Sequence, residues 1–100
     1  MPELPELNPV IHGKLRLALL SLLSGVEEAE FTWLRAKTGS TDGNLGAQLL
    51  KLEEAGYIAC TKSFEARRPK SEYRITPIGR KALLRYLEHI ETVIKATRRN

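Results

Sequence analysis

The sequence has few of the residues that build disulfide scaffolds, metal sites or membrane spans. Its 100 residues include one cysteine, Cys60, and two histidines. A single thiol forms no internal disulfide, and these residues lack the paired spacing of a zinc site. The most apolar stretch, residues 15–23, is interrupted by Arg16 and Ser21 and is too short to span a membrane. We therefore expect an intracellular, cytoplasmic protein that holds no metal and does not enter a membrane.

Patterns typical of enzymes are also missing. Gly39, Gly43 and Gly46 do not form the spacing of a phosphate-binding or dinucleotide-binding loop. No pairing of a nucleophile with a base is visible, so we expect no catalytic residue and no cofactor. Cys60 is most simply a small buried strand residue, and the alternative is a thiol that senses oxidation or metal.

Length and charge narrow the range of partners. With 100 residues, of which 42% are hydrophobic and 28% charged, the chain is predicted to form one domain over residues 1–100. The net charge is +4, and residues 56–100 carry 11 basic and 4 acidic side chains, whereas residues 1–30 carry 2 basic and 5 acidic ones. The basic excess lies in the C-terminal half, and this asymmetry favours an anionic partner.

The first half of the chain predicts three helices. Residues 1–9 contain three prolines and are expected to form an irregular arm, followed by a helix from near Val10 to about Ser24. Thr32 is a plausible N-cap for a short helix over residues 33–38 that ends at Gly39. Ser40 or Thr41 then caps a helix that reaches residue 55. Its buried side is expected to consist of Leu45, Leu49, Leu50 and Leu52.

The second half predicts a hairpin and a long helix. From residue 57 the apolar residues alternate as in a strand, and a second alternation covers residues 71–75. Residues 65–69 form the expected hairpin tip. Thr76 and Pro77 are a strong helix start, and the helix is predicted over residues 77–98. The fold class is mainly α with a small β-hairpin: a winged helix-turn-helix with a three-helix core, a wing and an added C-terminal dimerisation helix.

The second helix of a helix-turn-helix places its N-terminal residues in the DNA major groove. Asn44, Gln48 and Lys51 fall at helical spacing on the side opposite Leu45 and Leu49. Asparagine and glutamine amides pair with adenine, and lysine reaches guanine or phosphate. The alternative is a solvated polar face of the kind that every surface helix has. The residues expected to contact DNA from this helix are Thr41, Asp42, Asn44, Ala47, Gln48 and Lys51.

The expected hairpin tip carries two adjacent arginines, Arg67 and Arg68, with no apolar neighbour on which to pack. Contact with phosphate or with the minor groove explains their position. Lys62 and Lys70 extend this basic patch, either as phosphate contacts or as solvated side chains.

Several motifs of the chain occur together in one known group of proteins. Between His12 and Leu84 the sequence resembles the short winged-helix transcriptional regulators related to the MarR and ArsR families. The resemblance rests on Leu52-Glu53-Glu54-Ala55-Gly56-Tyr57-Ile58, Phe64-Glu65, Arg67-Arg68-Pro69 and Tyr73-Arg74-Ile75-Thr76-Pro77. It implies a dimer that binds double-stranded DNA without a separate ligand domain, and it does not extend to residues 95–100.

Surplus apolar residues on the first and last helices predict a homodimer, although they could instead cover the back of the same domain. The expected interface consists of Leu17, Leu20, Leu83, Leu87, Ile90 and Ile94. The leading hypothesis is a dimeric, sequence-specific transcriptional regulator. The alternatives are a winged-helix protein-interaction module without DNA readout, and a ligand or redox sensor whose output is DNA binding. The sequence does not identify an effector.

Overall fold

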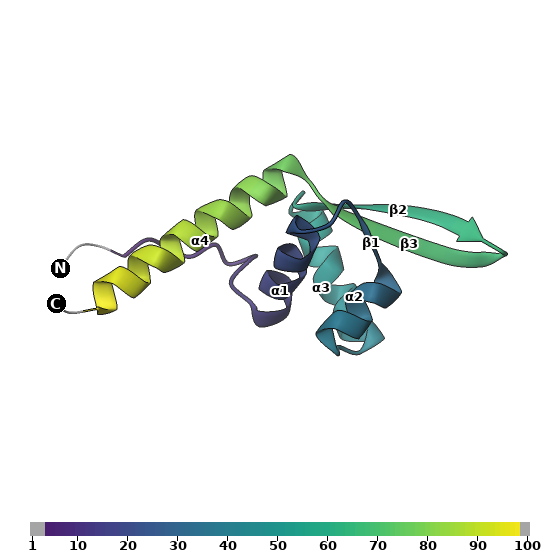
Figure 1. Cartoon of the computed structure of the whole chain (residues 1–100), viewed down its shortest axis with the longest axis horizontal. Coiled ribbons are helices and arrows are strands. Elements are labelled where there is room, and N and C mark those ends of the chain that lie inside the picture. The colour runs from purple at the N-terminus through teal and green to yellow at the C-terminus, as the bar shows by residue number, and fades with distance from the viewer. Residues whose placement is uncertain (1–3, 99–100) are drawn as a thin grey trace.

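The computed structural model describes residues 4–98 as four helices and a three-stranded antiparallel sheet. In Figure 1, three helices form the body, a hairpin projects from one end and a long helix extends towards the other, over a length of 59 Å. This arrangement confirms the winged helix-turn-helix with an added C-terminal helix. The elements are α1 (Lys14–Ser24), β1 (Ala29–Glu30), α2 (Phe31–Thr38), α3 (Asp42–Glu54), β2 (Ile58–Glu65), β3 (Arg68–Ile75) and α4 (Pro77–Thr97).

Polar caps, a proline and a glycine set three helix ends where the sequence predicted them. The Thr41 hydroxyl accepts a hydrogen bond of 3.2 Å from the backbone N–H three residues later and caps α3. The Thr76 hydroxyl accepts a 3.0 Å bond in the same way, and Pro77 occupies the first position of α4, where it removes no helical hydrogen bond. Gly39 ends α2 with a φ of +66°, a conformation that costs glycine little.

Two predicted helix starts are wrong. The first helix begins at Lys14 rather than near Val10, because the Asn8 carboxamide folds the preceding segment into a turn by accepting from the N–H of Val10 at 2.9 Å. The second begins at Phe31 with Glu30 in the cap position, so that Thr32 lies inside the helix. Ala29 and Glu30 pair with the sheet. This pairing fixes the direction of the chain, and the helix begins two residues earlier than predicted.

The segment before α1 belongs to the core. Ile11 is fully buried, and Leu7 and Val10 pack against the buried cluster. The Asn8 amide also donates a 2.8 Å hydrogen bond to the hydroxyl of Tyr57. Figure 1 shows this segment running beside α4. We call residues 4–13 the arm.

The sheet has the strand order β1-β3-β2. Its short edge strand, in which Ala29 pairs with Tyr73, was not predicted from the sequence. Strands β2 and β3 pair from Ile58 opposite Ile75 outward to Glu65 opposite Arg68. The turn is therefore two residues long, and the predicted five-residue tip was too long.

The core lies between the three-helix body, the base of the sheet and the first half of α4. Helix α3 contributes Leu45, Leu49 and Leu52, each no more than 1% exposed. No helix within residues 4–98 is long and apolar enough to cross a membrane. The other buried side chains include Leu19, Leu20, Leu23, Leu34, Ile58, Tyr73, Leu83 and Tyr86.

Candidate nucleic-acid interface

Helix α3 presents a mixed surface to solvent on the side away from its buried leucines. Of the six residues predicted to contact DNA from this helix, five are exposed. Leu50 is 54% exposed, so its predicted place on the buried side was wrong. It follows Leu49 by about 100° around the helix, which carries it out of the core. The five exposed residues are Thr41, Asp42, Asn44, Ala47 and Lys51.

The sixth residue, Gln48, is half-buried and turned towards α1, so its prediction as an outward-facing residue was wrong. Its Oε1 accepts a 2.5 Å hydrogen bond from Nη1 of Arg16. Its Nε2 donates to Oδ1 of Asn44 at 3.2 Å. Arg16 therefore connects α1 to the amides of the helix that was predicted to contact bases.

The carboxylate of Asp42 is engaged by α2. Nη1 of Arg35 donates a 2.7 Å hydrogen bond to Oδ1 of Asp42, and both side chains are largely exposed. The pair joins the last turn of α2 to the first turn of α3, where a negative charge also suits the helix dipole. An exposed pair of this kind contributes at most about 1 kcal/mol to stability.

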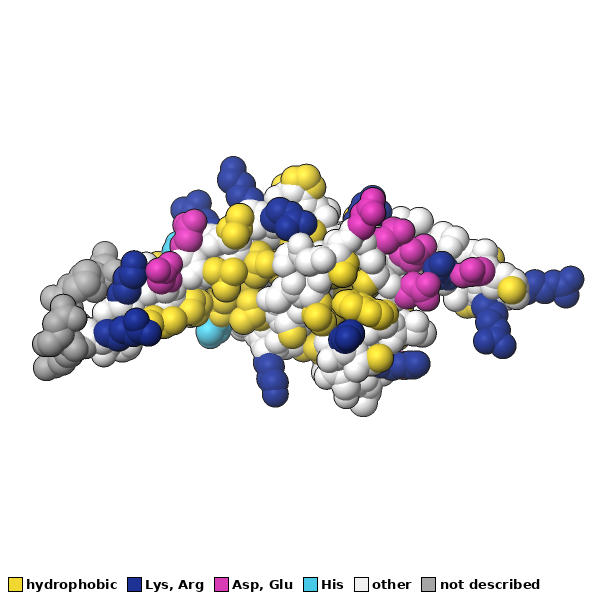
Figure 2. Space-filling view, in the orientation of Figure 1, with side chains coloured by type: hydrophobic (Ala, Val, Ile, Leu, Met, Phe, Trp, Pro, Cys, Tyr) yellow, Lys and Arg dark blue, Asp and Glu magenta, His cyan; other side chains and the backbone are white. Residues whose placement is uncertain are grey.

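The wing ends in a turn of unusual backbone conformation. Ala66 and Arg67 have φ of +50° and +67°, which is the left-handed region that non-glycine residues rarely adopt. Positive φ at both central residues is the geometry of a type I′ hairpin turn. Arg67 and Arg68 are exposed, and neither side chain has an ion-pair or hydrogen-bond partner among residues 4–98. Figure 2 shows basic side chains projecting from the far end of the hairpin.

Lys70 lies in a group of carboxylates on the wing. Its Nζ is 3.1 Å from Glu65, 3.3 Å from Glu30 and 3.9 Å from Glu72. Hydrogen bonds to Glu65 and then Glu30 raise the pKa of Lys70 above its ordinary value. These carboxylates neutralise its charge locally, and its contact with phosphate stays a prediction. Lys62, in contrast, is exposed.

The base of the wing is acidic. Burial raises the pKa of Glu72 above its ordinary value, and the neighbouring carboxylate of Glu28 raises it further. Figure 2 shows acidic side chains gathered on this part of the surface. The wing therefore has an acidic base and a basic tip that carries Arg67 and Arg68.

The residues predicted for a dimer interface divide into two groups. Leu20 and Leu83 are 0% and 4% exposed within one chain, so their assignment to an interface between chains was wrong. Within α4 no described residue after Tyr86 is buried, and Leu84, which was not among the residues predicted for the interface, is 56% exposed. The residues that keep exposed surface are Leu17 and Ile90, which are half-buried, and Leu87 and Ile94, at 45% and 43%.

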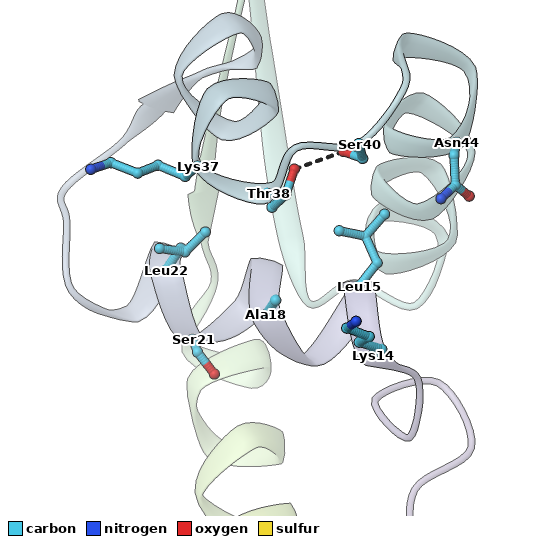
Figure 3. A pocket seen from close by; sticks show the side chains of 9 residues that line it. All are labelled: Lys14, Leu15, Ala18, Ser21, Leu22, Lys37, Thr38, Ser40 and Asn44. Atoms are coloured by element: carbon cyan, nitrogen blue, oxygen red, sulfur yellow. Dashed lines mark hydrogen bonds between the residues drawn. The ribbon is translucent and has the colours of Figure 1, made fainter.

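A groove of 740 Å³ separates α1 from the turn between α2 and α3. In Figure 3, Leu15, Ala18 and Leu22 of α1 face this turn across the groove, and Asn44 lies at one side. The hydroxyls of Thr38 and Ser40 are 2.7 Å apart on the opposite wall. The groove was not predictable from the sequence because its walls come from three separate elements.

Three residues of this surface were not predicted. Arg16 and Arg35 bind residues of α3, and Phe64 on the wing is 79% exposed opposite Pro69. The signal for Arg16 was present in the sequence, because a charge inside the most apolar stretch requires polar partners. Phe64 alternates with Ile58 and Cys60, and its exposure follows from the hairpin extending beyond the core.

Comparisons with known proteins agree with this geometry. A family model described as winged helix DNA-binding domain matches residues 15–94. An uncharacterized protein of Methanocaldococcus jannaschii is 40% identical over 81 residues, which cover 81% of this chain and 88% of that protein.

Solved structures show the same fold. A transcriptional regulator homologue from Pyrococcus horikoshii OT3 has a TM-score of 0.80 at 26% identity, covering 87% of this chain and 86% of that one. A MarR-family regulator from Enterococcus faecalis V583 has a TM-score of 0.68 at 28% identity, covering 87% and 77%. The chain therefore belongs to the winged helix DNA-binding domain family, and it is a winged helix-turn-helix protein related to transcriptional regulators of MarR type.

Proposed function

We propose that the protein binds specific sites on double-stranded DNA as a homodimer and thereby regulates transcription, without a catalytic step. Helix α3 enters the major groove, and the wing tip contacts phosphates or the adjacent minor groove. Asn44, Ala47 and Lys51 face the bases, while Arg67 and Arg68 bind the backbone. Lys62 adds a further phosphate contact.

The wing tip is the single observation that carries this proposal. Arg67 and Arg68 lie at the end of a hairpin that projects beyond the core, and no described residue pairs with them. Each left-handed non-glycine residue in the turn costs about 1 kcal/mol or more. Backbone strain of this kind is concentrated at functional sites. Two unpaired arginines on a strained projection have no role in stabilising this fold and are well placed to bind an anion.

An exposed apolar stripe on α4 supports the dimer. Leu84, Leu87 and Ile94 expose about half of their side-chain surface each and follow one another at helical spacing. A partner copy that covers this stripe removes apolar surface from water at about 25 cal/mol per Å². A twofold axis at α4 then presents two recognition helices about 34 Å apart, one turn of B-DNA.

The test is a binding titration at several salt concentrations. Fluorescence anisotropy of a labelled genomic duplex gives the slope of log affinity against log salt. We expect the Arg67→Ala, Arg68→Ala double variant to fold normally and to lower this slope by about one for each phosphate that it no longer neutralises. The control, Lys95→Ala with Arg98→Ala, removes the same two charges at the end of α4 far from the wing and leaves the slope unchanged (Figure 1).

Two outcomes contradict the proposal. If the wild-type protein does not bind duplex DNA at low salt, it is not a DNA-binding regulator. If the wing variant and the control variant behave alike, the arginines contribute only to net charge and the wing does not contact DNA.

A protein-interaction module is the second candidate function, and exposed Leu50 on α3 favours it. An apolar side chain on this face also fits the methyl group of thymine. Leu50→Ser separates the two functions. For a DNA reader the variant loses preference for thymine at one position of its site, whereas for an interaction module it leaves any weak DNA binding unaltered.

A further inference from the structure

A continuous chain of hydrogen bonds runs from the arm through α1 to the exposed surface of α3. The Arg16 guanidinium donates to the carbonyl of Pro9 at 3.3 Å and to that of Val10. Its Nη1 donates to Oε1 of Gln48, whose Nε2 donates to Oδ1 of Asn44. Asn44 is the exposed end of this chain, and it also borders the groove of Figure 3.

The chemistry of these groups fixes the direction of every bond in the chain. A guanidinium only donates hydrogen bonds, so Gln48 must turn its oxygen towards Arg16. The amide nitrogen of Gln48 then faces Asn44, and only the oxygen of Asn44 can accept from it. The nitrogen of Asn44, with its two N–H donors, takes no part in this chain of bonds.

We propose that Arg16 is a positioning residue that makes Asn44 a hydrogen-bond donor towards the major groove, and this inference rests on the proposed function. A free asparagine amide pairs with adenine by offering a donor and an acceptor side by side. In Asn44, one lone pair of the oxygen is taken by Gln48 while both N–H groups are free of these contacts, so donation is the better available role. Guanine presents two adjacent acceptors, O6 and N7, in the major groove. Asn44 is therefore biased towards guanine at the position it contacts, relative to the adenine that residue type alone predicts.

Gly13 keeps the position of the guanidinium open. A Cβ placed on Gly13 would lie 2.9 Å from Nη2 and 3.1 Å from Cζ of Arg16. The backbone of Gly13 is extended, with a φ of −159°, so alanine fits the chain conformation and only the arginine side chain must move. Gly13→Ala therefore displaces Arg16 without touching α3.

The experiment is selection of preferred sites from a randomised duplex library by the full-length protein. The wild type is expected to select guanine at one position of its site. The Asn44→Ala variant is expected to show no base preference at that position. Arg16→Met fills the space of the arginine stem but donates no hydrogen bonds, and it should release both amides. We expect Arg16→Met and Gly13→Ala each to reduce the preference for guanine about fivefold, which corresponds to the loss of one hydrogen bond. The fraction of selected sites with adenine at this position should rise.

Gln48→Glu gives the sharpest result. The carboxylate still accepts from Arg16, but it has no N–H to give, so Asn44 must turn its own nitrogen inward and its oxygen outward. Preference at the same position should move from guanine to a base that offers an N–H donor, cytosine or adenine. Lys51→Ala is the matched control on the same helix face, and it should leave this base unchanged while lowering affinity.

The outcomes are distinct. Melting temperatures of the variants show whether each one folds, and Gly13→Ala provides a second route if Arg16→Met does not. If Asn44→Ala loses the guanine preference but Arg16→Met, Gly13→Ala and Gln48→Glu retain it, the positioning role is refuted and DNA binding stands. If the wild type binds no duplex at all, the proposed function fails and this inference fails with it.

Discussion

Gly79, in the first turn of α4, allows this helix to pack directly on the chain that leads into β2. A Cβ built on Gly79 would lie 2.0 Å from the carbonyl oxygen of Tyr57 and 2.7 Å from its carbon. Contacts this short do not occur, so Gly79→Ala must push α4 away from Tyr57 by about 1 Å. The same carbonyl accepts a 3.0 Å hydrogen bond from the N–H of Thr76, and that bond is lengthened as the helix withdraws.

The expected loss of stability combines opposing effects. Overpacking of this kind costs about 1–3 kcal/mol, and the weakened hydrogen bond adds about 1 kcal/mol. Alanine returns about 1 kcal/mol through its higher helix propensity. The net destabilisation is therefore about 1–3 kcal/mol, which lowers Tm by roughly 5–20 °C for a domain of this size.

Gly46 provides the matched control in α3. A Cβ on Gly46 meets no atom within 4 Å outside its own helix and neighbouring residues. Gly46→Ala therefore gains the helix propensity alone and should raise Tm by about 4–8 °C. Thermal unfolding followed by circular dichroism at one fixed protein concentration measures both variants. If Gly79→Ala is as stable as the wild type or more stable, contact between α4 and Tyr57 does not require glycine at position 79, and the reasoning is refuted.

The wing and the long helix give three further predictions. Ala66→Asn places in the turn a residue that tolerates the left-handed region, and both arginines are retained. It should stabilise the protein by about 0.5–1 kcal/mol. A lower Tm would contradict the turn geometry. Because the pKa of Glu72 is raised in the folded state, the native protein holds a proton that the unfolded chain has released, and stability falls as pH rises through and above the ordinary carboxyl range. Glu72→Gln should therefore stabilise the protein more near neutral pH than in mild acid, and a gain that does not vary with pH would refute this origin. Leu87→Glu with Ile94→Glu should convert a sedimenting dimer to a monomer, while Ile78→Glu, at a site 65% exposed on the opposite side of α4, should leave it dimeric.

The functional surface was predictable from the sequence to different degrees. Arg67 and Arg68 were identified because they stand at a turn with no apolar neighbours, and the structure exposes both. Lys70 has the same charge and lies close to them in sequence, but in the fold it is surrounded by Glu65, Glu30 and Glu72. Glu65 and Glu72 are close to Lys70 in sequence, but the pairing of β1 with β3 brings Glu30 from a distant position, and the sequence does not show that all three carboxylates meet at Lys70.

The sequence by itself determined the order and type of the main elements. Periods of 3.6 and 2 in the apolar residues, the capping Thr41 and Thr76, Pro77 and the chain-reversing Gly39 are local signals that act within a few residues. Such signals do not depend on the rest of the fold, which explains why the three-helix core, the hairpin and the last helix were all predicted.

Only the tertiary structure decided which side of each element is buried and which polar groups meet. Leu50 and Leu20 are chemically alike, and packing alone places the first in solvent and the second in the core. The two-residue strand β1 exists because β3 is beside it to pair with. Arg16 and Asn44 are far apart in the chain and are connected only through Gln48 in the folded protein. Contacts of this kind depend on distances across the fold, and these are set by how all the elements pack together and not by any local stretch of sequence.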